Sequence, residues 1–98
     1  MTTTEYPNIQ NLINSLDNQN EATWDQLMEF ETNIADIHDE LGPDGINKDY
    51  LLWKATQTIY GKIGALYNGL ADKNELAACI LNYTEDGEIA ARLEAAAK

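Results

Sequence analysis

Carboxylates are the side chains of this sequence with the most obvious chemical use, and the first 47 residues contain them without any Lys or Arg. The sequence has 17 Asp and Glu against 6 Lys and Arg, a net charge of −11, and residues 1–47 contain ten of these acids and no Lys or Arg. At about 100° per helical residue, most acids of residues 21–40 fall on one side. We call five of them the acidic face: Asp25, Glu29, Asp36, Asp39 and Glu40.

The acidic face has two interpretations. It can be the solvated side of an amphipathic helix, or it can be a docking surface for a basic partner. Surface helices usually mix Lys and Arg with their acids, which gains pairs between successive turns and avoids self-repulsion. Because bases are absent here, we predict that the acidic face binds a basic or nucleic-acid-handling protein, with imitation of a phosphate backbone as one form. Such a surface repels nucleic acid and anionic membranes, so neither is an expected direct partner.

A catalytic or metal site is not expected. His38 is the single histidine and falls beside Leu27 and Glu31 at the border of an apolar stripe, with no Ser or Cys nucleophile at a recognisable spacing. One histidine among scattered acids is weak support for a metal site, and phosphate-binding glycine loops are absent. We predict no enzyme activity, no cofactor and no metal.

Residues 82–89 imitate the start of an EF-hand calcium loop, with Gly87 at position six and Ile89 at position eight. Position twelve of that loop should be a bidentate Glu, but Leu93 stands there and Glu94 follows one place late. The segment is therefore interpreted as a capped turn between two helices.

A second candidate surface is aromatic. Trp53, Tyr60 and Tyr67 are spaced seven residues apart, and residues 50–71 contain Lys54 and Lys62 but no acid. Such a row can serve self-association, or it can be covered by the first and fourth expected helices. The sequence leaves both alternatives open.

Two apolar stripes predict the elements that position these surfaces. The first is Leu27, Phe30, Ile34, Ile37 and Leu41, and the second is Leu52, Thr56, Ile59, Ile63, Leu66 and Leu70. Their spacing is that of buried helix faces. The intervening Gly42-Pro43-Asp44-Gly45 cannot continue a helix. We predict an all-α fold, a small bundle of four or five helices built on an antiparallel hairpin of about 23–41 and 48–70.

Local signals set expectations for the helix ends and for two glycines. Thr23 and Gln26 have the spacing of a capping box, and Asn47 can cap the helix that follows the turn. Gly61 and Gly64 lie inside that helix, where each costs about 1 kcal/mol relative to alanine. We expect them to permit close packing or to mark a bend.

The totals place the chain among small proteins with one domain. Its 98 residues suffice for a single core, predicted over residues 7–98 behind a flexible tail of residues 1–6. There is one cysteine, no apolar run of about 20 residues and no secretion signal at the start, which favours the cytoplasm.

From these features we expect a non-enzymatic adaptor or inhibitor that binds a protein through its acidic face. Its size and charge fit an inhibitor of a nucleic-acid-handling host protein, of the kind that phages and mobile elements encode. The alternative is a self-assembling structural subunit joined through Trp53, Tyr60 and Tyr67, or an oligomer that sequesters a small ligand.

Overall fold

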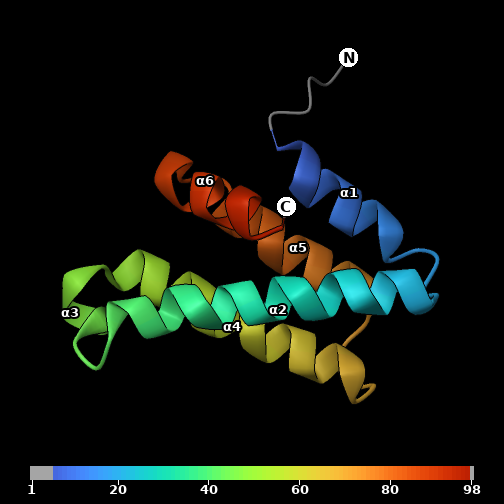
Figure 1. The fold of residues 1–98 in the computed structure, drawn as a ribbon, viewed down its shortest axis with the longest axis horizontal. Helices are drawn as coiled ribbons and strands as arrows, with labels where there is room; N and C mark the ends of the chain where they lie inside the picture. Colours follow the sequence, from blue (N-terminus) through green and yellow to red (C-terminus); the bar gives the residue numbers. More distant parts are fainter. Residues whose placement is uncertain (1–5, 98) are drawn as a thin grey trace.

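The computed structural model describes residues 6–97, which form helices and, within that range, no strand. In chain order these are α1 (Pro7–Ser15), α2 (Glu21–Leu41), α3 (Gly45–Lys48), α4 (Tyr50–Tyr67), α5 (Lys73–Tyr83) and α6 (Gly87–Ala96) (Figure 1). The predicted all-α bundle is confirmed. No helix in this described part combines the length and apolar character needed to cross a bilayer. The predicted tail lies outside the described residues except for Tyr6, which packs partly buried against the core.

The predicted antiparallel hairpin is formed by α2 and α4, with the one-turn α3 between them (Figure 1). Glycine is needed at Gly45, because a Cβ there would lie 2.8 Å from the Cβ of Leu41 and 3.1 Å from the Trp53 ring. The second arm of the hairpin begins later than predicted. Asp49, not Asn47, caps α4 by accepting a hydrogen bond from the backbone N–H of Leu52 at 3.1 Å. The turn therefore uses residues 45–48 for α3 before α4 starts.

The two apolar stripes face each other across the hairpin and form the centre of the core. Leu27, Phe30 and Ile34 of α2 are buried, as are Ile59 and Ile63 of α4. Burying a side chain of this size contributes about 1.5–3 kcal/mol. Apolar residues of α1, α5 and α6 complete the same cluster, namely Ile9, Leu12, Leu76, Ile80, Ile89 and Leu93.

The prediction that Leu70 belongs to the second buried stripe is wrong. Leu70 is 81% exposed, because α4 ends at Tyr67 and the chain reverses at Gly69 with a φ of 73°. The N–H groups of Gly69 and Leu70 bond back to the carbonyls of Leu66 and Ala65, which closes the helix before it reaches Leu70.

Polar contacts at the helix ends join segments that are far apart in sequence. The α1 N-terminus has no cap of its own, and the Glu94 carboxylate of α6 accepts from the N–H groups of Asn8 and Ile9 at 2.8 and 3.0 Å. In the same last turn of α6, the Asn33 amide of α2 donates to the carbonyl of Ala96 at 2.8 Å. Orphan backbone groups of two helix ends are satisfied in this way.

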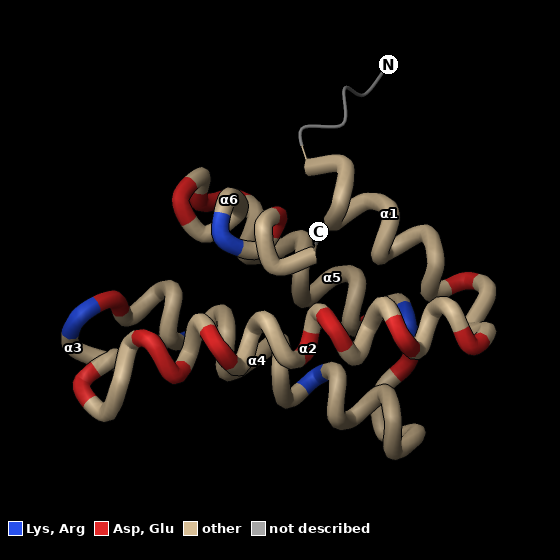
Figure 2. The backbone as a smooth tube through the Cα atoms, in the orientation of Figure 1, with Lys and Arg blue, Asp and Glu red and all other residues tan. Residues whose placement is uncertain are grey.

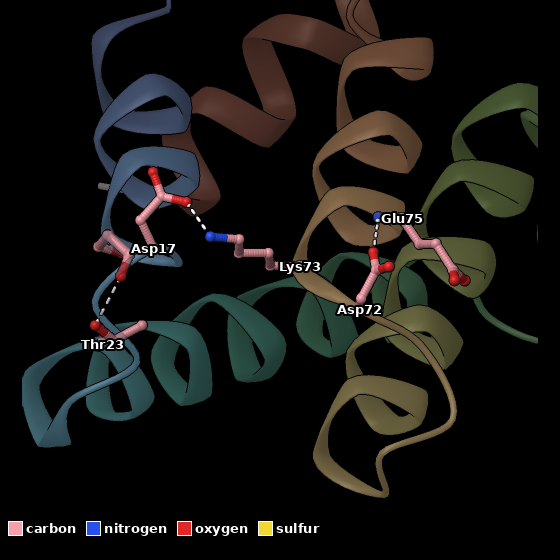
Figure 3. A network of polar contacts seen from close by, with 6 residues as sticks. Asp17, Thr23, Asp72, Lys73 and Glu75 are labelled. Atoms are coloured by element: carbon pink, nitrogen blue, oxygen red, sulfur yellow. Dashed lines mark hydrogen bonds and ion pairs between the residues drawn. The ribbon is translucent and has the colours of Figure 1, made fainter.

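A similar junction ties the α1–α2 corner to the start of α5 (Figure 3). The Thr23 hydroxyl donates to the Ser15 carbonyl at the end of α1, at 2.9 Å. The expected capping box with Thr23 as the N-cap is wrong. The N-cap of α2 is Asn20, three residues earlier, and its side chain accepts a hydrogen bond from the Thr23 N–H. Lys73 pairs with Asp17 across this junction.

Neither glycine inside α4 serves the packing role that we expected of it. The helix continues through Gly61 and Gly64 as one element, and a Cβ at either position would have no neighbour within 4 Å. The expectation that these glycines let another helix approach closely is wrong within residues 6–97, because no other helix packs against either position. The two glycines therefore cost helix stability without an internal gain.

Alanine at these positions tests that conclusion. Gly61→Ala and Gly64→Ala should each raise the free energy of unfolding by about 0.5–1 kcal/mol, because alanine loses less backbone entropy in a helix. Urea denaturation followed by circular dichroism measures the change. Gly69→Ala is the contrast and should lower stability, since its φ of 73° disfavours a side chain. A loss of stability in both α4 variants would contradict the open space seen there.

Candidate functional site

The packing of α2 places the acidic face in solvent. Asn20 starts the helix, the apolar stripe turns one side into the core, and all five predicted residues of the acidic face are exposed on the other side. Figure 2 shows acidic segments recurring along α2, which lies in front of α4 and α5 in this view. The structure thus brings the five residues onto one exposed helix surface.

One carboxylate of the acidic face has a basic partner. Glu40 accepts from the Arg92 guanidinium of α6 at 2.9 Å, and both side chains are about half-exposed or more. The other ion pairs among residues 6–97 join Lys62 to Glu75 and Lys73 to Asp17. An exposed pair contributes about 0.2–1 kcal/mol, so Glu40 is held but not withdrawn from solvent. Within the described residues, Asp25, Glu29, Asp36 and Asp39 form no ion pair.

An apolar side chain lies within the acidic face, and the sequence pattern did not single it out. Met28 is 57% exposed and lines a shallow depression with Asp25 and Glu29. Thr32 and Asn33 complete this depression. Flexible, polarizable methionine side chains suit contact surfaces that adapt to a partner. The sequence signal that could have identified Met28 was its position on the polar side of the α2 helical wheel.

The predicted aromatic row lies along the seam between α2 and α4. Trp53 sits beside His38 with ring centroids 6.0 Å apart, and Tyr67 sits beside Trp24 at 5.7 Å. Partial cover for the two ends of the row therefore comes from α2, which was not among the helices expected to cover it. Between these two pairs, Tyr60 remains 48% exposed. Tyr67 is 41% exposed despite its contact with Trp24 and Trp53 is half-buried, so both tyrosine rings remain accessible.

A cavity of about 400 Å³ opens between α2 and α4 beside Tyr60. Its lining comes from both helices: Ala35, His38, Asp39, Thr56, Gln57 and Tyr60. Asp39 belongs to the acidic face as well, so the cavity and the acidic face share a border. Sequence reasoning found Asp39 and Tyr60 separately but could not place them at one cavity.

His38 and Thr56 both line this cavity, and in the described part of the chain they are not hydrogen-bonded to each other. The His38 Nε2 is buried without a hydrogen-bond partner, and the His38 ring lies beside Trp53. The Thr56 hydroxyl, a candidate nucleophile in the cavity lining, donates instead to the carbonyls of Leu52 and Trp53 at 3.0 Å. Nucleophilic catalysis needs a hydroxyl that is bonded to a base, which this arrangement lacks.

One carboxylate of the EF-hand-like segment, residues 82–89, and that of Glu94 bind backbone N–H groups. The Asp86 carboxylate accepts from the N–H groups of Glu88 and Ile89 at 3.0 and 3.2 Å and so caps α6. Glu94, the displaced candidate ligand, caps α1. Within residues 6–97, no three His, Cys, Asp or Glu side chains gather closely enough to hold a metal ion.

Two groups have a raised pKa, Cys79 in α5 and Tyr67 at the end of α4. Burial raises the pKa of the Cys79 thiol above its ordinary value, and the nearby Lys62 charge opposes that shift. Burial also raises the pKa of Tyr67, with a further contribution from the Glu31 carboxylate. A thiol with a raised pKa is a poor nucleophile at neutral pH. Cys79 therefore resembles a packing residue in the groove between α4 and α5.

Comparison of the chain with protein-family models, with curated proteins and with solved structures finds no match. Any functional assignment must therefore come from the side chains described above.

The reactivity of Cys79 checks its environment. Its rate of modification by a disulfide reagent should rise with pH through a midpoint above that of an unperturbed thiol, because burial disfavours the thiolate. Lys62→Met should move the midpoint further up, since it removes a charge that stabilises the thiolate. Lys54→Met, on the same helix, is the control and should leave the midpoint unchanged. A midpoint at or below the ordinary value would contradict this account.

Proposed function

We propose that this protein is a non-enzymatic adaptor or inhibitor that binds a basic protein through the acidic face of α2. A partner that handles nucleic acid is the natural class, because such proteins carry clustered Lys and Arg. One observation carries the proposal: four neighbouring carboxylates, on Asp25, Glu29, Asp36 and Asp39, are exposed without an ion pair among the described residues.

Electrostatics gives this observation its weight. Like charges on successive turns of a helix destabilise it by about 0.2–0.5 kcal/mol per pair, and α2 contains no Lys or Arg to offset them. A basic partner would relieve that repulsion in the complex. Complementary charge also accelerates encounter and makes binding sensitive to salt. The exposed Met28 adds an apolar contact among the charges.

The spacing of the charges limits how closely the surface imitates nucleic acid. At about 1.5 Å per residue, Asp25 to Glu40 span roughly 22 Å, or one carboxylate per ~5 Å. Each strand of duplex DNA carries one phosphate per ~3.4 Å. Imitation of a phosphate backbone is therefore coarse, and an inhibitor of the kind that mobile elements encode would need contacts beyond charge. We propose general recognition of a basic protein surface first, with this finer role second.

Charge reversal on the acidic face tests the proposal. A peptide of alternating Lys and Gly is a defined probe, and its dissociation constant should rise about tenfold in the Asp25→Lys, Asp36→Lys variant. The loss follows from replacing attraction by repulsion at two positions of the acidic face, one at its start and one in its second half. Isothermal titration calorimetry at low and at physiological ionic strength measures both the affinity and its salt dependence.

A variant of equal net charge supplies the control. Glu85→Lys with Glu88→Lys changes two exposed acids outside α2 and shifts the net charge from −11 to −7, as the test variant does. This control should retain most of the affinity. Equal losses in the two variants would show that only total charge matters, and the acidic face would then have no specific role.

A self-assembling subunit is the second candidate, and the exposure of Tyr60 favours it. The ring is 48% exposed on a helix with two lysines and no acid. Two copies of a molecule with a net charge of −11 repel each other least where acids are absent. Exposed tyrosines on such a surface are common anchors of protein interfaces.

Sedimentation equilibrium separates this candidate from the first. Self-association through α4 predicts a mass that increases with protein concentration, and Tyr60→Asp should restore the monomer by adding charge to the contact. Asp36→Asn changes α2 instead and should leave the association intact. A monomeric mass at every concentration would remove the second candidate.

A further inference from the structure

We propose that the partner of the acidic face inserts an arginine side chain into the cavity between α2 and α4, with its guanidinium between Asp39 and Tyr60. The inference rests on the proposed function, because it names the side chain by which a basic partner is recognised. It concerns a built cavity with a defined lining.

The cavity has the size and composition of a side-chain pocket. Its volume of about 400 Å³ falls at the lower end of ligand pockets, which span about 300–1,000 Å³. Room exists there because Ala35 projects only a methyl group from α2 in the same lining as Tyr60. The aliphatic stem of a long side chain can pack on Ala35 while its polar end reaches the border with the acidic face.

Charge selects a cation for this cavity. Among residues 6–97, Asp39 supplies the one carboxylate in the lining, and no Lys or Arg belongs to it. The carboxylate of Asp39 forms no ion pair within the described residues. A cation entering from the acidic face therefore meets unopposed negative charge along its path.

The aromatic ring favours guanidinium over ammonium. Tyr60 presents a half-exposed ring in the cavity, and Gln57 adds an amide oxygen that can accept a hydrogen bond. Arginine stacks on aromatic rings, sheds its hydration more readily than lysine and binds a carboxylate through two parallel hydrogen bonds. Lysine offers charge alone and gains less from this arrangement.

Two peptides of equal length and charge test the inference, one alternating Arg and Gly and the other Lys and Gly. We expect the dissociation constant of the arginine peptide to be about fivefold lower, as a stacked guanidinium implies. Tyr60→Ala should abolish this preference while both peptides still bind. Tyr60→Phe keeps the ring and should keep the preference. Fluorescence anisotropy of labelled peptides measures the affinity of each peptide for the unchanged protein and for both Tyr60 variants.

Matched controls assign the preference to the cavity. Tyr50→Ala removes another exposed tyrosine of α4, outside the cavity lining, and should leave the preference unchanged. Asp39→Asn should reduce the preference, whereas Asp25→Asn removes the same charge and should weaken both peptides equally. Circular dichroism confirms that each variant is folded.

The outcomes separate this inference from the proposed function. Equal affinity for the two peptides, with strong salt dependence, would overturn the arginine pocket and leave the acidic face standing as a binding surface. An arginine preference that survives Tyr60→Ala would also overturn it. Binding of neither peptide would remove both the proposed function and the pocket.

Discussion

The packing of α2 against α4 is the constraint on which the rest of this structure depends. Phe30 and Ile34 from one helix and Ile59 and Ile63 from the other are buried in the same core. Because side chains are fixed around a helix at about 100° intervals, burying this stripe also fixes where every other side chain of α2 points. The acidic face is held in solvent by the apolar contacts on the opposite side.

The remaining helices are joined to this hairpin by apolar packing together with polar contacts at helix ends. Glu94 caps α1 from α6, and Asn33 of α2 binds the last turn of α6. These contacts use carboxylate and amide groups that the sequence offers for other chemistry. A residue that looks like a displaced calcium ligand therefore acts on backbone N–H groups. The acids of the chain therefore have two different roles. Glu94 stabilises a helix end, whereas the carboxylates of the acidic face are exposed to solvent.

Local sequence predicted the hairpin well where helix-breaking residues and periodic apolar residues agree. It failed where two local signals competed, as at the start of α4, where Asp49 takes the cap from Asn47. The role predicted for Gly61 and Gly64 was wrong for another reason, since helical spacing already places both glycines away from the buried stripe of α4 and the prediction did not use it. The acidic face could be drawn from a helical wheel, whereas the cavity beside Tyr60 requires the relative positions of two helices.

By itself, the sequence determined the all-α class, the two stripes and the grouping of carboxylates on one side of α2. These are local properties, set by residue spacing along a single helix. The tertiary structure decided that rings of α2 contact both ends of the aromatic row, that Arg92 holds Glu40 and that Glu94 caps α1. It also decided that Asp39 and Tyr60 line one cavity. These contacts join residues distant in the chain, and only the packing of whole helices brings such residues together.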